Sequence, residues 1–393
     1  MPILQEKIEV NLIWVIHSET KISEYKCEKY EKIIRMNEYN NAFEILEKEK
    51  PDLIYIIPGI NAPDYAFSLA AKSLKIFRIG SELGNVLFTK KSKIGILSQI
   101  KNNEENNETN QIQKFFKNHR FLIKTQKRNK WNYFKIFFDL CSIFFMYFPV
   151  KGSRPDFSTK FQLDLHFVES ELTVKTLTDL GFEKSKIMIT GNPSYDKIFK
   201  NDDNFKKTNS INQKCKILIL TTTIYGESRN KTIRKRNLFI TEVIKKIIKI
   251  KNDNEIVVKI HPTHENLDEY RKIIDKIDPE IPVFQEEDLK ELIENTDLII
   301  TPVSNSSVIS GLIQKKQIIV WNVFDVQNDI LLENKLALEC KDPNELLSLI
   351  ERAKKREYSD EKVDEFISKY LFKADGKATE RIAKAILKIL ENK

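Results

Sequence analysis

The sequence predicts an α/β protein built from two doubly wound, parallel-sheet domains that face a cleft. Short and almost continuously apolar runs recur along the chain, for example Leu53–Ile57, Ile256–Ile260 and Leu298–Ile300. Amphipathic segments with helical spacing separate these runs, and strands buried on both faces alternate with helices in open parallel sheets. The length of 393 residues also exceeds that of one ordinary core. Together these observations predict two Rossmann-like domains.

The first predicted domain spans residues 1–200. Its expected strands are Val10–Ile16, Leu53–Ile57, Ile76–Ile79, His166–Val168 and Ile187–Thr190, and its expected helices are Tyr25–Lys48, Asp64–Ser73 and Glu171–Leu180. An insert covers about residues 100–155 and begins with a polar, low-complexity stretch that is typical of a loop. A second strongly polar stretch, Lys200–Lys214, is the expected linker to the next domain.

The second predicted domain spans residues 214–374, and residues 375–393 are expected to form a C-terminal helix. The expected strands are Lys216–Leu220, Ile256–Ile260, Val283–Phe284, Leu298–Ile300 and Ile318–Trp321. The expected helices are Arg236–Lys249, Leu267–Lys276, Leu289–Asn295, Ser307–Gln314 and Pro343–Lys355. The regular alternation predicts a second sheet with helices on both faces.

Bulk properties favour a soluble, cytoplasmic protein. The formal net charge of +8 is a modest excess. The four cysteines are far apart in the sequence and predict free thiols in a reducing compartment. The first ten residues lack the apolar core of a signal peptide. The longest apolar run, Phe134–Val150, contains Lys135 and Asp139 and is too short to be expected to span a membrane.

Two strand ends carry the strongest functional pattern. One strand ends in His261-Pro262, and another is followed by Ser304-Asn305-Ser306-Ser307 at the start of a helix. Ligands of open parallel sheets bind beyond the carboxyl ends of the strands. The start of a helix offers free N–H groups and a positive dipole end to an anion. These segments therefore predict a diphosphate pocket for a nucleotide sugar, with His261 as the catalytic donor to the leaving phosphate.

Other residues are expected at the same edge of the second sheet. The predicted substrate contacts there are Thr222, Thr223, Gly226, Lys259 and Asn322, with Asp325 beside Asn322. Glu82, which follows the strand Ile76–Ile79, is the preferred catalytic base, and Asp64 and Glu19 are the alternatives. We expect no cofactor and no metal. The order His261-x-x-His264-Glu265 follows a strand, whereas zinc sites of that spacing lie on a helix.

Each of these residues also has a purely structural interpretation. His261 could be an ordinary loop histidine, and Ser306 or Ser307 could be an ordinary helix N-cap. The threonines that begin at Thr221 could form a plain polar loop, Lys259 could be solvated, and Asn322 could lie in a surface loop. The pattern alone leaves these alternatives open.

The insert carries a separate signal in residues 114–151. Eight lysines and arginines lie between Lys114 and Lys135 with no acid among them, and aromatic residues are interleaved with them and follow them. Cations mixed with rings suit an anionic membrane surface or a lipid-linked acceptor. Packing of the rings inside the first domain is the next interpretation, and single-stranded nucleic acid is the least favoured partner.

Five stretches of the chain resemble the glycosyltransferase-B (GT-B) superfamily. The likeness is to the branch with UDP-N-acetylglucosamine 2-epimerases, CDP-glycerol transferases and bacterial sialyltransferases. The stretches are Pro58–Gly84, His166–Asp196, the His261-Pro262 strand, Ser304–Lys316 and Asp375–Ile386. This resemblance implies a GT-B-like fold and a nucleotide-sugar substrate linked to CMP, CDP or UDP.

The sequence departs from the epimerase motifs of that branch at four places. His17-Ser18-Glu19 replaces the G-T-R-P-E loop, and Gly59-Ile60-Asn61 replaces G-D-T. Thr221–Glu227 stands in place of the H-R-x-E-N loop, and Ser304–Ile309 stands in place of the S-G-G-x-Q-E-E helix start. The His261-Pro262 and Ser306-Ser307 pairs resemble those of transferases that bind CMP or CDP donors. With the missing acids, this likeness implies an inverting, metal-independent glycosyltransferase acting on a surface-glycan or lipid-linked acceptor, at the inner face of the membrane. The alternatives are a UDP-N-acetylglucosamine 2-epimerase-like epimerase or hydrolase, a CDP-glycerol-type polyol phosphate transferase and a non-catalytic binding subunit.

Overall fold

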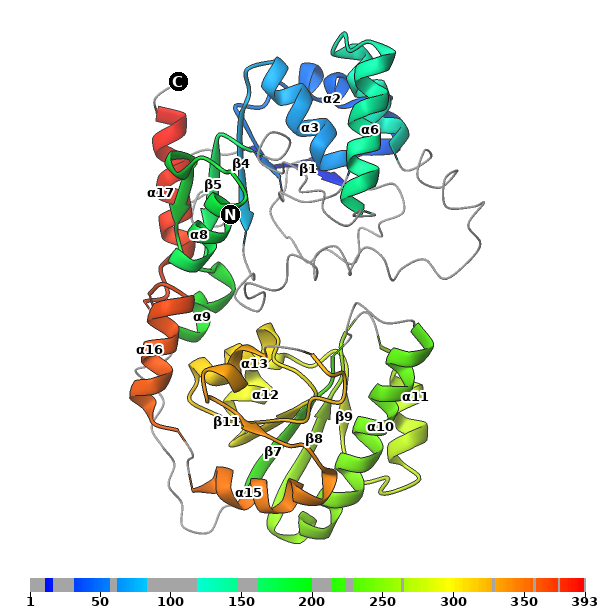
Figure 1. Ribbon diagram of the computed structural model, residues 1–393, viewed down its shortest axis with the longest axis vertical. Coiled ribbons are helices and arrows are strands. Elements are labelled where there is room, and N and C mark those ends of the chain that lie inside the picture. Colours follow the sequence, from blue (N-terminus) through cyan, green and yellow to red (C-terminus); the bar gives the residue numbers. More distant parts are fainter. Residues whose placement is uncertain are drawn as a thin grey trace. The chain divides into compact units, whose positions relative to one another are not determined.

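The computed structural model describes most of the chain, and its elements are labelled in Figure 1. The described residues are 11–16, 32–56, 62–82, 119–147, 162–199, 214–222, 229–262, 265–326, 329–355, 358–373 and 375–391. The chain divides into two compact units. The first comprises Met1–Leu83, Glu104–Pro193 and Lys377–Lys393, and the second comprises Gly84–Asn103 and Ser194–Gly376.

The first unit contains two parallel sheets. β1 (Ile13–Ile16) pairs with β2 (Lys32–Arg35). The larger sheet has the order β3-β4-β5-β6, with β3 at Leu53–Ile56, β4 at Phe77–Glu82, β5 at Leu165–Val168 and β6 at Ile187–Ile189. The expected helix Tyr25–Lys48 is wrong over residues 32–41, where Lys32–Arg35 is a strand, and is confirmed over residues 42–48, which lie in α2 (Ala42–Glu49).

Helices from distant parts of the sequence cover these sheets. α3 (Ala62–Ser73), the helical residues 119–128 and α6 (Tyr133–Tyr147) share one core with α2. α17 (Ala378–Glu391) packs with Ala383 and Ile386 against Ile79 and Phe167. α8 (Glu171–Asp179) follows β5. The C-terminal helix thus belongs to the core of the first unit.

The second unit contains one six-stranded parallel sheet of order β12-β11-β10-β7-β8-β9. The strands are β7 (Cys215–Leu220), β8 (Asn254–Lys259), β9 (Val283–Phe284), β10 (Leu298–Thr301), β11 (Gln317–Val320) and β12 (Leu338–Glu339). In chain order this is the Rossmann arrangement 3-2-1-4-5-6, read from β9 to β12. The strand order reverses between β7 and β10, which makes that point the topological switch.

Both faces of this sheet carry helices. α10 (Arg229–Ile247), α11 (Leu267–Ile274) and α15 (Leu346–Lys354) contribute to one large core with the strands. α12 (Leu289–Glu294), α13 (Ser306–Ile313), α14 (Ile330–Glu333) and α16 (Asp360–Tyr370) complete the unit. α13 lies very close to β10, because a Cβ added at Gly311 would stand 2.2 Å from the Cδ1 atom of Ile299. The α/β class with parallel sheets is confirmed.

No helix among the described residues is both long and apolar enough to cross a membrane.

Candidate functional site at the carboxyl edge of the second sheet

The strands of the second unit end at one level. Ile300 pairs with Ile219, which pairs with Val258, and Leu220 pairs with Lys259. On either side, Thr301 pairs with Val320 and Lys259 pairs with Phe284. The residues that follow these strands therefore share one edge of the sheet. They include Thr221, Thr222, His261, Gln285, Ser304 and Asn322.

The switch point lies at this edge, between β7 and β10. Thr221 and Thr222 follow β7 and are buried, and α13 follows β10. β8, which leads to His261, is the next strand beyond β7. Neighbouring strands are about 4.8 Å apart, so the ends of β8 and β10 are roughly 10 Å apart with β7 between them. One diphosphate-linked molecule can bridge such a span.

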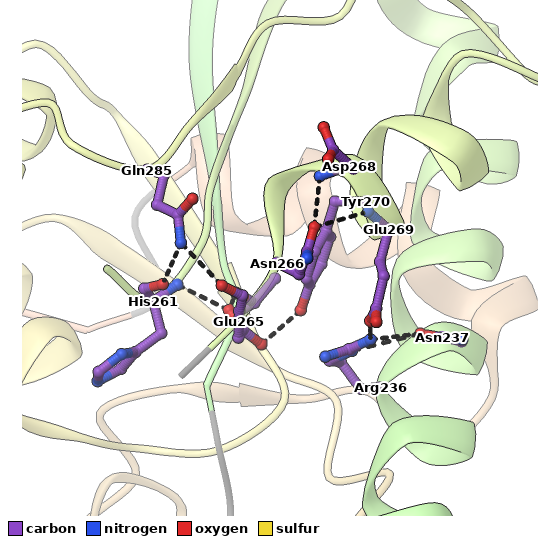
Figure 2. A network of polar contacts seen from close by, with 10 residues as sticks. Arg236, Asn237, His261, Glu265, Asn266, Asp268, Glu269, Tyr270 and Gln285 are labelled. Carbon is purple, nitrogen blue, oxygen red and sulfur yellow. Dashed lines mark hydrogen bonds and ion pairs between the residues drawn. The ribbon is translucent and has the colours of Figure 1, made fainter. Parts of the chain in front are cut away.

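A buried carboxylate, that of Glu265, holds the loop after β8. It accepts a hydrogen bond from the hydroxyl of Thr221, one of 2.5 Å from the hydroxyl of Tyr270 and one of 2.7 Å from the backbone N–H of His261. Figure 2 shows this network, with the imidazole ring of His261 pointing away from Glu265. The backbone at His261 is therefore held from behind while its ring points outward.

Gln285 holds the same loop from the end of β9. Its side-chain amide donates to the backbone oxygens of His261, Pro262 and Glu265 at 3.3, 3.2 and 2.8 Å. With Glu265 it fixes the position at which the His-Pro turn leaves the sheet (Figure 2). No sequence pattern points to Gln285, and Glu265 stands out in the sequence only as part of the order His261-x-x-His264-Glu265.

Lys259 lies behind this loop and is not solvated. Its side chain is buried, and its ammonium donates to the backbone oxygens of Ile260 at 3.0 Å and of Gln285 at 2.6 Å. Burial lowers the pKa of Lys259, and Glu287, Glu286 and Glu265 partly oppose that shift. Two of its three N–H bonds thus serve the loops themselves.

A second layer supports Glu265. Tyr270 is fully buried on α11, and burial raises the pKa of its hydroxyl well above the ordinary value. The guanidinium of Arg236, on α10, lies 4.9 Å from the centre of the Tyr270 ring and donates to Glu269 at 2.7 Å. Because Tyr270 stays protonated, it is a permanent hydrogen-bond donor to Glu265.

The start of α13 differs from the sequence-based interpretation in one detail. Its N-cap is Asn305, whose side-chain oxygen accepts from the N–H of Val308 at 3.0 Å. Ser306 is exposed and Ser307 half-buried in the first turn, where backbone N–H groups have no partner within the helix. The two hydroxyls are therefore not needed as caps and remain available to a ligand.

Ser304 and Asn322 serve their own loops. Ser304 donates its N–H and its hydroxyl to the buried Asp329, at 2.8 and 2.6 Å. The side chain of Asn322 donates to the oxygen of Val326 at 2.7 Å and accepts from its N–H at 2.8 Å. The neighbouring Asp325 accepts from Lys235 at 2.9 Å. These hydrogen bonds hold the loops that follow β10 and β11.

Several predicted residues lie outside the described part of the chain. They are Thr223, Gly226, His264, Glu19, the motif Gly59–Asn61 and residues 114–118 and 148–151 of the basic, aromatic segment. Glu82 ends β4 in the first unit and pairs with Val168, but its side chain is not described. Asp64 lies in the first turn of α3. The base assignment stays a prediction.

The groups that the edge presents are mainly donors. They comprise the imidazole of His261, which points away from Glu265, and the first turn of α13 with its two serines. The acids beside them, Glu265 and Asp329, are occupied by internal hydrogen bonds. Such an arrangement suits an anion. Among the described residues, no three or more His, Cys, Asp and Glu side chains gather into a group that could hold a metal ion.

Sequence comparison places this edge within a known family. The family model described as UDP-N-acetylglucosamine 2-epimerase matches residues 162–387, which is more than half of the chain. The chain belongs to this family. No curated protein sequence matches it.

Solved structures of such epimerases share the fold. The UDP-GlcNAc 2-epimerase of Methanocaldococcus jannaschii superposes with a TM-score of 0.55 at 17% identity, covering 98% of this chain and 94% of that one. Its complex with UDP-GlcNAc and UDP gives 0.52 at 16%, covering 96% and 100%. The Neisseria meningitidis enzyme bound to UDP-GlcNAc gives 0.51 at 14%, covering 92% and 86%. The fold is that of the GT-B superfamily, and the protein is an enzyme of that superfamily.

The expectation of a glycosyltransferase is wrong. It rested on missing acids in a few loops and on the His-Pro and Ser-Ser pairs, whereas the family match covers the second sheet and the helices on both sides of it. The epimerase alternative of the sequence analysis is the one that the match favours. Loops at strand ends change more readily than the scaffold that carries them, so they were a weak basis for excluding the family.

Proposed function

We propose that the protein is a nucleotide-sugar enzyme that acts on UDP-N-acetylglucosamine or a close relative without a second sugar acceptor. The observation that carries this proposal is the family match over the sheet whose switch-point edge presents His261 and the start of α13. UDP supplies the diphosphate that such an edge binds. The solved relatives in complex with UDP-GlcNAc or UDP support this choice of ligand.

The chemistry begins with departure of the diphosphate. Inversion at C2 requires the C2–H bond to break: a base takes the C2 proton, the electron pair of that bond forms a C1=C2 double bond, and the C1–O pair leaves with the diphosphate. Groups that stabilise the leaving oxygens accelerate that step. In the proposal His261 donates to the leaving phosphate, and the N–H groups and hydroxyls of Ser306 and Ser307 bind its oxygens. Lys259 adds positive charge from behind the loop.

Two products can follow from this common step. Return of a proton to the other face of C2 and of the diphosphate to C1 gives the C2 epimer. Addition of water at C1 gives the free sugar and UDP. This chain lacks the acids of the G-D-T and S-G-G-x-Q-E-E motifs, having Gly59-Ile60-Asn61 and Ser304–Ile309 instead. That difference favours hydrolysis as the second candidate outcome.

Incubation with UDP-N-acetylglucosamine alone, in D₂O and followed by NMR, tests the proposal. An epimerase incorporates deuterium at C2, and a hydrolase releases UDP. His261→Ala should lower the rate at least about a hundredfold, the typical effect of losing one such donor. It should leave the melting temperature unchanged, because the network at Glu265 uses the backbone of His261 rather than its ring.

Lys276→Ala, on the surface of the second unit, is the control. Absence of any product from UDP-, CDP- and CMP-linked sugars would remove the proposal.

A further inference from the structure

One face of α6 exposes four large aromatic side chains. Tyr133, Phe134, Phe137 and Phe138 are 78, 74, 61 and 60% exposed. Three of these rings touch, since Phe138 lies 5.5 Å from Phe134 and 5.8 Å from Phe137 between ring centres. Exposed large hydrophobic residues that form one contiguous cluster usually mark an interaction surface. We call these four residues, with Trp131, the aromatic face.

The helix that carries this face is firmly held on its other side. Ile136, Leu140 and Ile143 are buried in the core of the first unit. Asp139 accepts a hydrogen bond of 2.6 Å from Gln126 and one of 3.3 Å from Tyr65. The four exposed rings of α6 therefore lie on the outer side of a packed helix.

Lysines border and cover the rings. The ammonium of Lys127 lies 5.0 Å from the centre of the Tyr133 ring, and that of Lys135 lies 4.1 Å from the centre of the Trp131 ring. Lys130 is exposed on the turn between the two helices. The only acid from 119 to 143 is Asp139, and it bonds to the inward-facing groups named above. The surface is thus both aromatic and cationic.

We propose that this surface docks the protein onto an anionic lipid bilayer. Rings at the headgroup level with lysines on the lipid phosphates are the chemistry of interfacial binding. A protein partner fits less well, because the core of a protein interface is depleted of lysine. The docking surface lies in the first unit and requires nothing of the nucleotide-sugar site. It is independent of the proposed function.

Co-sedimentation of the full chain with vesicles tests this proposal. The protein should bind vesicles of phosphatidylcholine with 30% phosphatidylglycerol and bind pure phosphatidylcholine at least about tenfold more weakly. Phe134→Ser/Phe137→Ser should reduce binding to the anionic vesicles at least tenfold. Each basic residue near such a surface contributes about fivefold in affinity, so Lys127→Gln/Lys130→Gln/Lys135→Gln should reduce it on the order of a hundredfold.

Two matched controls make the result specific. Leu238→Ser removes another exposed apolar side chain, 52% exposed and in the second unit, and Lys249→Gln/Lys272→Gln/Lys276→Gln removes three exposed lysines there. Both should bind vesicles like the unchanged protein, and all variants should keep its melting temperature. Equal loss in variants and controls, or equal binding to neutral vesicles, overturns the proposal. The proposal is also overturned if the aromatic and lysine variants change only the oligomeric state seen by light scattering, or if the protein prefers a single-stranded oligonucleotide to anionic vesicles.

Discussion

The two units place buried polar groups at opposite ends of similar sheets. In the first unit the cluster lies at the amino ends of β4 and β5, where Arg78 donates to Asp164 at 2.7 and 3.0 Å and to Ser68 at 3.1 Å. In the second unit the cluster around Glu265 lies at the carboxyl ends of β7 and β8. Ligands bind at carboxyl ends. The buried polar cluster around Arg78 should therefore contribute to stability, and the one around Glu265 should contribute to substrate binding.

The largest expected effect on stability comes from the first cluster. Arg78→Met leaves the carboxylate of Asp164 without its two-pronged partner. Breaking a buried pair in this way costs about 3 kcal/mol of unfolding free energy, since Asp164 keeps some contact with solvent. Urea unfolding measures this loss. UDP binding measured at a temperature where the variant is folded should be unchanged, and a loss of binding there would break the distinction between the two clusters.

The second cluster should behave in the opposite way. Glu265→Gln keeps one acceptor oxygen but turns an amide N–H group toward at least one of the three donors that Glu265 serves, so it should cost about 2 kcal/mol of stability. The His-Pro loop then loses its support, and turnover should fall at least about a hundredfold. Asp278→Asn, which removes a buried charge paired with Lys251 at the amino edge of the sheet, is the matched control. Turnover that follows stability alone in both variants would argue that Glu265 only stabilises the fold.

A pH dependence sharpens the comparison, because the first cluster contains a buried histidine. The Nε2 atom of His166 accepts from the N–H of Leu163 at 2.9 Å, and its ring meets Phe182 edge to face. The pKa of His166 is lowered from 6.5 to about 4, mainly by burial and then by the charges of Arg78 and Lys186, while Asp164 opposes the shift. A lowered histidine pKa means that its contribution is complete above pH 6.5 and is lost as the pH falls from 6.5 toward 4.

Unfolding free energy should therefore fall by about 2 kcal/mol between pH 7 and pH 5 through this group. His166→Asn removes the titrating ring and should flatten that part of the profile, which denaturant unfolding across the pH range records. His261→Ala, which removes a histidine of the second unit, is the control. A profile that stays equally steep in His166→Asn would contradict the assignment.

The comparison also shows what sequence could predict. Apolar runs such as Leu298–Ile300 predicted the strands because a fully buried strand has no polar face. β2 was missed because Lys32–Arg35 is half polar and its pairing with β1 joins separate segments. The role of Glu265 was equally hidden, since its partner Thr221 lies 44 residues away. Only the fold brings such groups together.

The basic, aromatic segment illustrates the same limit. Membrane binding and internal packing were rival interpretations of one composition. In the described part both environments occur on one helix, with Ile136 and Leu140 buried and Phe134 and Phe137 exposed. Composition does not say which side of a helix meets the core. The helical period assigns the sides only after the neighbouring elements are known.

Titration of UDP into the protein by calorimetry tests the central claim most directly. The account predicts binding by the unchanged protein, weakened at least about tenfold in His261→Ala and several-fold in Ser306→Ala/Ser307→Ala, each a loss of hydrogen bonds to a charged phosphate. Arg78→Lys, in the other cluster, should bind UDP normally. Undiminished affinity in both His261→Ala and Ser306→Ala/Ser307→Ala, or no affinity in the unchanged protein, would contradict the assignment of the nucleotide site to the carboxyl edge of the second sheet.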